Sequence, residues 1–236
     1  MHVPQRTISD SKTLRRAEVA RVLVELHRKA RRSKNTRLTL TLFRLTTCCG
    51  LRVSEATGLR LRDVCVNVDR PRIKVPAAVA KGRKVRRTNG KVVKVGSRAV
   101  AREISLLWDA GTLDDLRSWK EFRERQGASA NDYFLCSQQA TAFGRRLDRR
   151  NARTRFVGAC RVLGADRAGE LTVHSGRHSF CSLALAGGRS LAEVRQAAGH
   201  ASVATTNLYV HLCTDDDDEA GNLFDFTHNN GNGDPR

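Results

Sequence analysis

Short helical segments with sharp boundaries make up residues 174–211 of this sequence. The first, over residues 174–186, stops at a pair of glycines. A capping box that starts at Ser190 opens the second, which stops at Gly199, and Ser202 is a suitable N-cap for the third. These boundaries predict a helical region in which polar side chains lie at fixed positions near helix ends.

The polar side chains of this region have the chemistry of a phosphoryl-transfer site. His174 stands at the start of the first helix, and Arg177 lies one turn later. The turn between the second and third helices would expose His200, and the third helix would carry Tyr209. A tyrosine hydroxyl can attack phosphorus when a histidine accepts its proton, and guanidinium groups bind phosphate oxygens.

The first part of the chain supplies a second guanidinium. An apolar stripe predicts a helix over residues 14–30. The alternation at residues 38–42 predicts a strand, whereas its continuation to Gly50 predicts a buried helix, and local reasoning does not decide between them. Ser54 is a good N-cap for a short helix, which places Arg52 at a helix start that favours an anion.

The middle of the chain is predicted to contain a basic β-hairpin. Residues 73–95 are rich in strand formers, residues 88–91 (Thr-Asn-Gly-Lys) predict a turn, and Pro76 restricts the strand before it to an edge or a bulge. Helices are expected over residues 112–127 and 143–163. Lysines crowd the hairpin, and one of them would serve as proton donor to a departing sugar hydroxyl.

The composition indicates a polyanionic partner. The 236 residues include 43 Lys and Arg against 24 Asp and Glu, a formal charge of +19, which favours nucleic acid over a membrane surface. Seven cysteines without a Cys-x-x-Cys pair argue against a disulfide framework and a thiolate zinc site, and favour a reducing cytoplasm. No metal or other cofactor is expected, because the arginines supply the charge that Mg²⁺ supplies in nucleases.

Three motifs, in this order, resemble the catalytic domain of the tyrosine recombinases, the phage integrase family. Residues 50–55 (Gly-Leu-Arg-Val-Ser-Glu) match the family's arginine segment. Residues 174–178 (His-Ser-Gly-Arg-His) match its His-x-x-Arg-His box. Gly199-His200, followed by residues 205–209 (Thr-Thr-Asn-Leu-Tyr), match its tyrosine segment, so the resemblance covers residues 38–211.

The resemblance implies an α+β fold that is mainly α-helical with a small antiparallel three-stranded sheet. Two arginines would clamp the scissile phosphate of double-stranded DNA, with two histidines beside them. The tyrosine would form a 3′-phosphotyrosyl link, a hairpin lysine would complete the site, and the protein would assemble as a tetramer on DNA. The residues implied are Arg52, Lys81, His174, Arg177, His200 and Tyr209.

Two features depart from the family's pattern. The stretch after Lys81-Gly82 is long and lysine-rich, so Lys84, Lys91 and Lys94 stay alternatives for the general acid. Family members carry an N-terminal helical domain that closes around DNA, for which the residues before the catalytic segment are too few. The predicted organisation is a basic helical segment over residues 1–35, a catalytic domain over 36–213 and an acidic C-terminal tail over 214–236.

Two other interpretations stay open. A chain without the N-terminal domain could be an inactive relative that only binds DNA. Alternatively, His174 and His178, four residues apart on a helix, could bind a metal. The second interpretation is weakened because neither the glutamate of a His-Glu-x-x-His motif nor a cysteine partner accompanies them.

Overall fold

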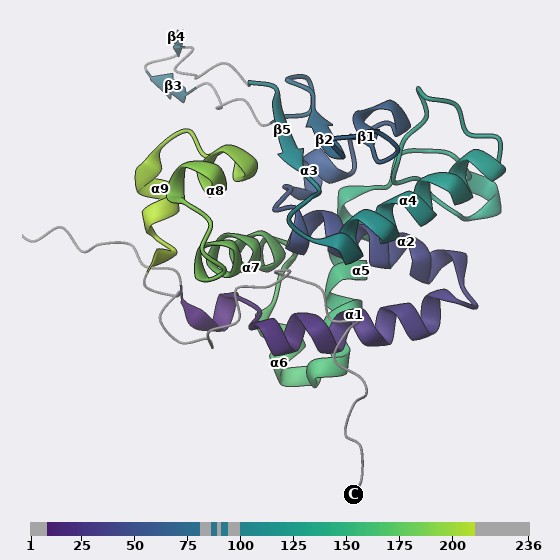
Figure 1. Ribbon diagram of the computed structural model, residues 1–236, viewed down its shortest axis with the longest axis horizontal. Helices are drawn as coiled ribbons and strands as arrows, with labels where there is room; N and C mark the ends of the chain where they lie inside the picture. Colours follow the sequence, from purple (N-terminus) through teal and green to yellow (C-terminus); the bar gives the residue numbers. More distant parts are fainter. Residues whose placement is uncertain (1–8, 81–85, 89–90, 94–99, 211–236) are drawn as a thin grey trace, which may run out of the picture.

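The computed structural model describes residues 9–80, 86–88, 91–93 and 100–210, and it consists of a helical body with a small sheet at its edge (Figure 1). The helices are α1 (Arg16–Ala30), α2 (Lys34–Phe43), α3 (Val53–Ala56), α4 (Ala110–Arg125), α5 (Arg149–Cys160), α6 (Ala165–Glu170), α7 (Val173–Ala186), α8 (Leu191–Ala198) and α9 (Val203–Asn207). The strands are β1 (Val64–Cys65), β2 (Arg72–Val75), β3 (Arg86–Thr88), β4 (Lys91–Val93) and β5 (Arg102–Ser105).

Helix α2 lies at the centre of the helical core. It packs against α1, α4 and α5, and the π-helical segment Arg44–Cys48 that continues it packs against α7. The rings of Phe43 and Phe156 stack with their centroids 5.4 Å apart where α2 meets α5. Packing around α2 therefore holds the N-terminal and C-terminal parts of the chain together.

The alternation at residues 38–42 does not form a strand. Its three leucines and Thr41 are all buried in α2, because neighbouring helices cover this helix on several sides. The hydroxyl of Thr41 donates to the carbonyl oxygen of Arg37 at 2.9 Å, one turn earlier. A helix without a polar face shows no helical period, so the strand expectation was wrong and the buried helix forms.

The sheet places β5 beside β2, although the two strands are far apart in the sequence. Strands β1, β2 and β5 are antiparallel in the order β1-β2-β5, and Ile73 pairs with both Val64 and Ile104. These three side chains are buried, so one face of the sheet lies on the core. Strands β3 and β4 form a separate antiparallel hairpin. The predicted hairpin and the small three-stranded sheet are confirmed.

Helix starts in the middle of the chain differ from the predicted ones. Asp109, not Thr112, is the N-cap of α4, and it accepts from the backbone N–H of Thr112 at 3.1 Å. Asp148 caps α5, which begins later than the predicted residue 143. The starts of α7, α8 and α9 lie where the sequence predicts them. Aspartates in loops were the missed signal at the first two sites.

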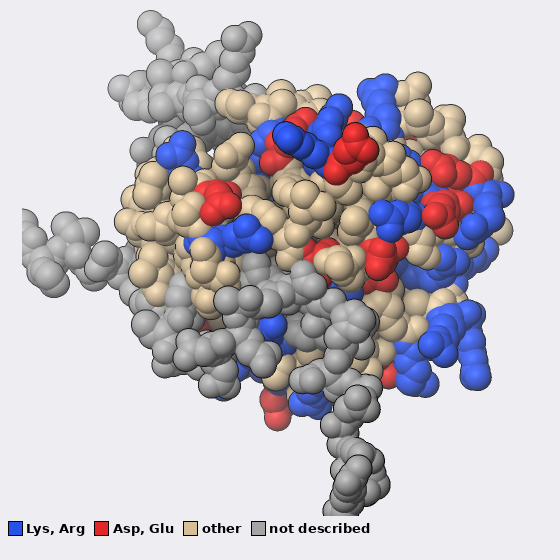
Figure 2. All heavy atoms as spheres, viewed as in Figure 1, with Lys and Arg blue, Asp and Glu red and all other residues tan. Residues whose placement is uncertain are grey.

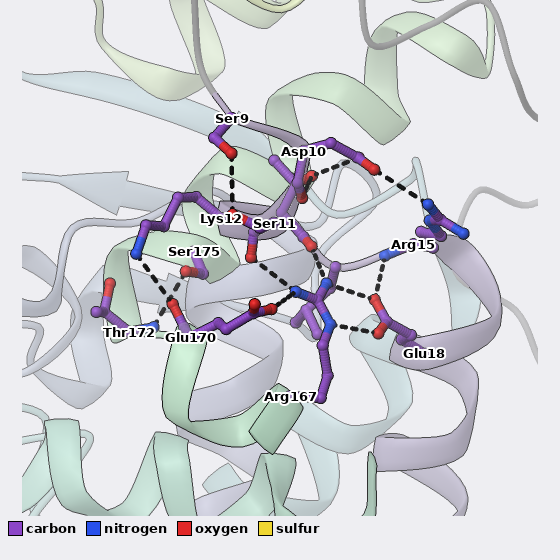
Figure 3. A network of polar contacts seen from close by, with 12 residues as sticks. Ser9, Asp10, Ser11, Lys12, Arg15, Glu18, Arg167, Glu170, Thr172 and Ser175 are labelled. Atoms are coloured by element: carbon purple, nitrogen blue, oxygen red, sulfur yellow. Dashed lines mark hydrogen bonds and ion pairs between the residues drawn. The ribbon is translucent and has the colours of Figure 1, made fainter. Parts of the chain in front are cut away.

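Arg167 of α6 ties the start of the described chain to the core. Its Nε donates to the Glu18 carboxylate on α1 at 2.6 Å, and Nη1 donates to the carbonyl oxygen of Ser11 at 2.7 Å (Figure 3). Nearby, the backbone N–H of Leu14 donates to the hydroxyl of Ser179 on α7 at 2.6 Å. Helix α1 thus shares one core with α2 and α7, while the division of the chain at residue 35 stays a prediction.

Basic side chains gather where α1 and α2 meet, at the right-hand end of the view in Figure 2. In the part of the chain that the structure describes, no helix is long and apolar enough to cross a membrane. The predicted acidic tail, residues 214–236, lies outside the described residues. The exposed basic residues where α1 and α2 meet are Arg28, Lys29, Arg31, Arg32 and Lys34.

Candidate active site

Gly50 makes the turn that brings Arg52 into the site. Its φ is +65°, and a Cβ there would lie 2.3 Å from the ring of Phe180, so only glycine fits. Arg52 is then the N-cap of α3, and its backbone N–H donates to Oε2 of Glu55 at 2.9 Å. Ser54, predicted as the N-cap, lies inside the helix, because the Glu55 carboxylate satisfies the backbone at Arg52 instead.

Glu55 also holds the guanidinium of Arg52. Its buried carboxylate accepts from Nη1 of Arg52 at 2.9 Å, and Nη2 of Arg52 donates to the carbonyl oxygen of Gly199 at 3.3 Å. Burial raises the pKa of Glu55, but hydrogen bonds and charges of Arg102 and Arg52 outweigh it and lower that pKa. Arg52 is thereby joined to the turn that carries His200.

Arg177 lies beside the Gly50 turn. It is 6% exposed on α7, and its Nη1 donates to the carbonyl oxygen of Gly50 at 2.6 Å. Within the described chain, the buried Nη2 of Arg177 has no hydrogen-bond partner. Burial and the positive charge of Arg52 lower the pKa of Arg177 to about 10. A buried guanidinium with an unused donor, next to a second guanidinium, is suited to bind an oxyanion.

The sequence predicted that Tyr209 lies on the third helix of this region. In the structure it lies in the turn that follows α9. It is 3% exposed, its hydroxyl lies 2.8 Å from Nδ1 of His178, and it is also hydrogen-bonded with the Cys181 thiol. Burial and Cys181 raise the pKa of Tyr209, whereas Arg177 and Arg52 act to lower it. The phenol is therefore neutral near pH 7 and is bonded to a histidine that can accept its proton.

Two histidine rings flank Tyr209. The ring centroids of His178 and His200 lie 5.8 Å and 6.1 Å from that of Tyr209, and the His200 ring is within 3° of parallel to it. His200 is 9% exposed, with Nδ1 3.0 Å from the Thr206 hydroxyl. The exposed position expected for His200 is wrong, because its ring packs inward between Thr206 and Tyr209.

His178 was not among the predicted catalytic residues. His174 is exposed on α7 and is an electrostatic neighbour of His178, which lies one turn further along the same helix. A signal was available in the sequence, since residues four apart share a helix face. What the sequence could not give is the position of the Tyr209 turn, which decides that His178 is the histidine bonded to the hydroxyl.

The predicted general acid lies outside the described residues. This holds for Lys81, Lys84 and Lys94, and of Lys91 only the backbone in β4 is described. Among the residues that the structure describes, no group of three His, Cys, Asp or Glu side chains is placed to hold a metal ion.

The sequence of this chain matches the model of the Phage integrase family over residues 12–215. The chain belongs to this family. Tyrosine recombinase XerC of Corynebacterium efficiens is 31% identical over 163 residues, which is 69% of this chain and 43% of the relative. The XerC of Stutzerimonas stutzeri is 31% identical over 76% of the chain and 48% of its own length. The chain thus spans about half the length of the curated relatives it matches.

Solved structures of family members share the fold. XerA recombinase has a TM-score of 0.61 at 20% identity, covering 89% of this chain and 61% of that protein. XerH site-specific recombinase, in a post-cleavage complex with its difH substrate, has a TM-score of 0.62 at 21% identity, covering 87% and 51%. The expected mainly helical fold with a small three-stranded sheet is therefore the fold of this family.

Half-buried His178 and buried His200 predict an acid-sensitive fold. Burial and nearby positive charge lower the pKa of His178 to about 4 and that of His200 to about 3. Unfolded histidine binds its proton near pH 6.5, so the unfolded chain binds more protons and stability falls as pH drops below that value. Between pH 7.5 and 5, urea unfolding should show a loss on the order of 1–2 kcal/mol per histidine.

The variant His178→Gln separates the contribution of His178 to the pH-dependent stability from that of His200. It removes one of the two titrating rings, so its free energy of unfolding should change with pH about half as much as that of the wild type. A pH dependence equal to that of the wild type would show that the folded state does not hold this ring neutral.

Proposed function

We propose that the chain cleaves and rejoins DNA strands at specific sites through a 3′-phosphotyrosyl intermediate on Tyr209. The observation that carries the proposal is the convergence of Tyr209 with two arginines and a hydrogen-bonded histidine in one buried cluster. Family membership supports it, since the named relatives are tyrosine recombinases. Because the chain spans only about half of those relatives, the activity is proposed and not transferred.

In the first step the phenol oxygen of Tyr209 attacks the scissile phosphorus. The new bond joins this oxygen to phosphorus, and the bond from phosphorus to the 5′ oxygen breaks. The pKa of His178 is lowered to about 4, so its ring is unprotonated at neutral pH. Its Nδ1 is therefore free to accept the phenolic proton of Tyr209. The departing 5′ oxygen takes a proton from one of the candidate lysines between residues 81 and 94 and leaves as a hydroxyl.

Negative charge grows on the non-bridging phosphate oxygens during this step. Nη2 of Arg177 is the buried donor that would bind one of them, and Arg52 is held by Glu55 close enough to share the charge. His200 bonds Thr206 through Nδ1, so a phosphate would meet its Nε2, and the exposed His174 would lie at the entrance. The second step reverses the first with a new 5′ hydroxyl, and because the ester bond is conserved, rejoining needs no ATP.

A nicked suicide duplex tests the activity directly. If the short fragment that carries the new 5′ hydroxyl diffuses away after cleavage, the wild-type chain should remain covalently attached to DNA and migrate as an adduct on a denaturing gel. DNA binding that weakens steeply with salt, but without any adduct across substrates and conditions, would instead support a protein that only binds DNA.

Single replacements of the hairpin lysines should identify the general acid. We expect Lys81→Ala to slow cleavage about 100-fold, because the leaving oxygen loses its proton donor. A substrate with a 5′-bridging phosphorothiolate should restore the rate of the correct variant, since a thiolate leaves without protonation. Lys84→Ala, Lys91→Ala and Lys94→Ala are the matched controls, and wild-type cleavage by Lys81→Ala would exclude that residue.

The proposal includes a partner, an assembly and a location. The partner is double-stranded DNA, bound in the cell interior, and the assembly is a tetramer on two DNA sites. Two structures support DNA as the partner, since XerH was solved in complex with difH and lambda integrase as a dimer bound to a core site. The tetramer rests on the family resemblance alone. Analytical ultracentrifugation with and without duplex DNA would measure the assembly of this chain.

A further inference from the structure

Arg102, the first residue of β5, donates hydrogen bonds to two other elements of the fold. Its Nη1 and Nη2 donate to the two carboxylate oxygens of Glu55 at 3.2 Å and 2.8 Å, and its Nε donates to the carbonyl oxygen of Ala197 at 2.9 Å. The side chain is 8% exposed. A planar guanidinium therefore bridges β5, α3 and the end of α8.

The two groups that Arg102 binds each hold a residue of the candidate site. Glu55 also binds Arg52, so a shift of the Glu55 carboxylate would move the Arg52 guanidinium. Ala197 lies in the last turn of α8, three residues before His200. The chain reverses there at Gly199, whose φ is +65°.

The guanidinium of Arg102 packs closely against Gly199. A Cβ at Gly199 would lie 2.8 Å from Cζ of Arg102, which is closer than real Cβ contacts allow. The glycine is thus required twice, for its left-handed backbone and for the guanidinium that lies against it. The Gly199 carbonyl oxygen in turn accepts from Nη2 of Arg52, which closes a ring of contacts between Arg102, Glu55, Arg52 and the turn.

We propose that Arg102 is a positioning residue for strand cleavage, which sets Arg52 through Glu55 and His200 through the α8–Gly199 turn. Its Nε, Nη1 and Nη2 each donate to a protein group and the side chain is 8% exposed, so it acts through its neighbours and does not bind the phosphate. Arg102 also pairs with Val75 of β2 across the antiparallel ladder. One side chain thereby relates two contributors to the reaction, Arg52 and His200, and this inference rests on the proposed function.

Lysine cannot replace this arginine. A single ammonium can bind the Glu55 carboxylate or the Ala197 carbonyl oxygen, but it lacks the planar fork that spans both. We expect single-turnover cleavage of the suicide duplex to fall about 100-fold in Arg102→Ala and about 10-fold or more in Arg102→Lys, because small displacements of catalytic groups have effects of this size. The dissociation constant for the duplex should change less than about threefold in Arg102→Lys, since the phosphate contacts themselves are kept.

Arg72→Ala is the matched control. Arg72 lies on the neighbouring strand β2 and pairs with Glu103 at 3.2 Å in a partly exposed ion pair, so its loss also removes an arginine–carboxylate contact from the sheet. This variant should cleave at the wild-type rate. Equal losses in Arg72→Ala and Arg102→Ala would overturn the proposal in favour of a general role of charge in the sheet.

Gly199→Ala gives a second, independent test. In the wild-type background the new Cβ displaces the Arg102 guanidinium, and cleavage should fall about as far as in Arg102→Ala. In the Arg102→Ala background the obstruction is gone and only the strain of a left-handed backbone at this position remains, so adding Gly199→Ala should slow cleavage by a clearly smaller factor than it does in the wild-type background. Multiplying losses in the double variant would show that the two residues act separately and would overturn the proposal.

A readout without reaction separates this inference from the proposed function. The ring ¹⁵N resonances of His200 should shift in Arg102→Ala and stay in place in Arg72→Ala, whether or not the protein cleaves DNA. If the wild type forms no adduct, the proposed function fails. The His200 resonances still test whether Arg102 positions the turn that carries His200. Wild-type resonances in Arg102→Ala, or full cleavage by that variant at temperatures where it is folded, would overturn the inference.

Discussion

Tyr209→Phe should form no covalent adduct with a suicide duplex, with cleavage reduced by at least about 10³-fold. The change removes only the oxygen that would bond to phosphorus. The buried ring and its contacts with His178 and His200 are kept. Loss of the buried hydroxyl's hydrogen bonds should cost about 1 kcal/mol of stability, which is too little to unfold a domain of this size. Gel detection of the adduct and a melting curve of the same sample measure both effects.

The chain offers a matched control, because it contains only two tyrosines. The other is Tyr133, whose ring lies under the guanidinium of Arg60 with its centroid 5.0 Å from Cζ. Tyr133→Phe keeps that contact and should cleave at the wild-type rate. An adduct that persists in Tyr209→Phe would transfer the nucleophile to another residue, and its loss in both variants would indicate a nonspecific effect.

Arg177→Met should reduce cleavage about 10³-fold while leaving the DNA-free protein as stable as the wild type, or more so. The loss follows from removing a buried donor that would bind the charged phosphate oxygens of the transition state. The stability follows from the pKa of about 10, which shows that burial disfavours the charged form of this guanidinium in the folded state. A group with a lowered basic pKa reduces stability at every pH below that value, and methionine removes this cost.

Single-turnover cleavage and thermal melting in the absence of DNA measure the two effects. The control is Arg117→Met on α4, where the arginine forms a partly exposed ion pair with Asp114 at 2.8 Å, so both cleavage and melting should change little. Arg177→Lys should stay nearly as slow as Arg177→Met, since one ammonium cannot bind the Gly50 carbonyl oxygen and a phosphate as the fork does. Cleavage by Arg177→Met within tenfold of the wild type would contradict the assignment.

Much of the fold followed from local signals. Serine caps and glycine stops located α7 to α9, and the Asn-Gly turn located the β3–β4 hairpin. The failures also had physical causes. The Leu-Thr alternation of residues 38–42 misled because burial on several sides of α2 removes the polar face by which a helix is recognised. The starts of α4 and α5 were misplaced because aspartates further upstream cap them.

The candidate site also has a part that the sequence predicted and a part that it did not. The motif residues Arg52, Arg177, His200 and Tyr209 lie near one another in the fold, and their catalytic roles stay a prediction. Three of their supports were not predicted, because each depends on a contact across the fold. His178 bonds Tyr209 from a separate helix, Glu55 binds two arginines, and Arg102 reaches from the sheet to the end of α8.

The sequence by itself determined the family, the three helices α7 to α9 and the types of group that would meet a phosphate, because residue identity and short-range spacing suffice for these. Only the tertiary structure decided which histidine bonds the tyrosine, that a buried donor of Arg177 has no partner within the described chain, and that Arg102 contacts both Glu55 and the end of α8. These facts depend on how α3, α7, α8 and β5 pack. Distances between residues far apart in the sequence leave no periodic trace in it.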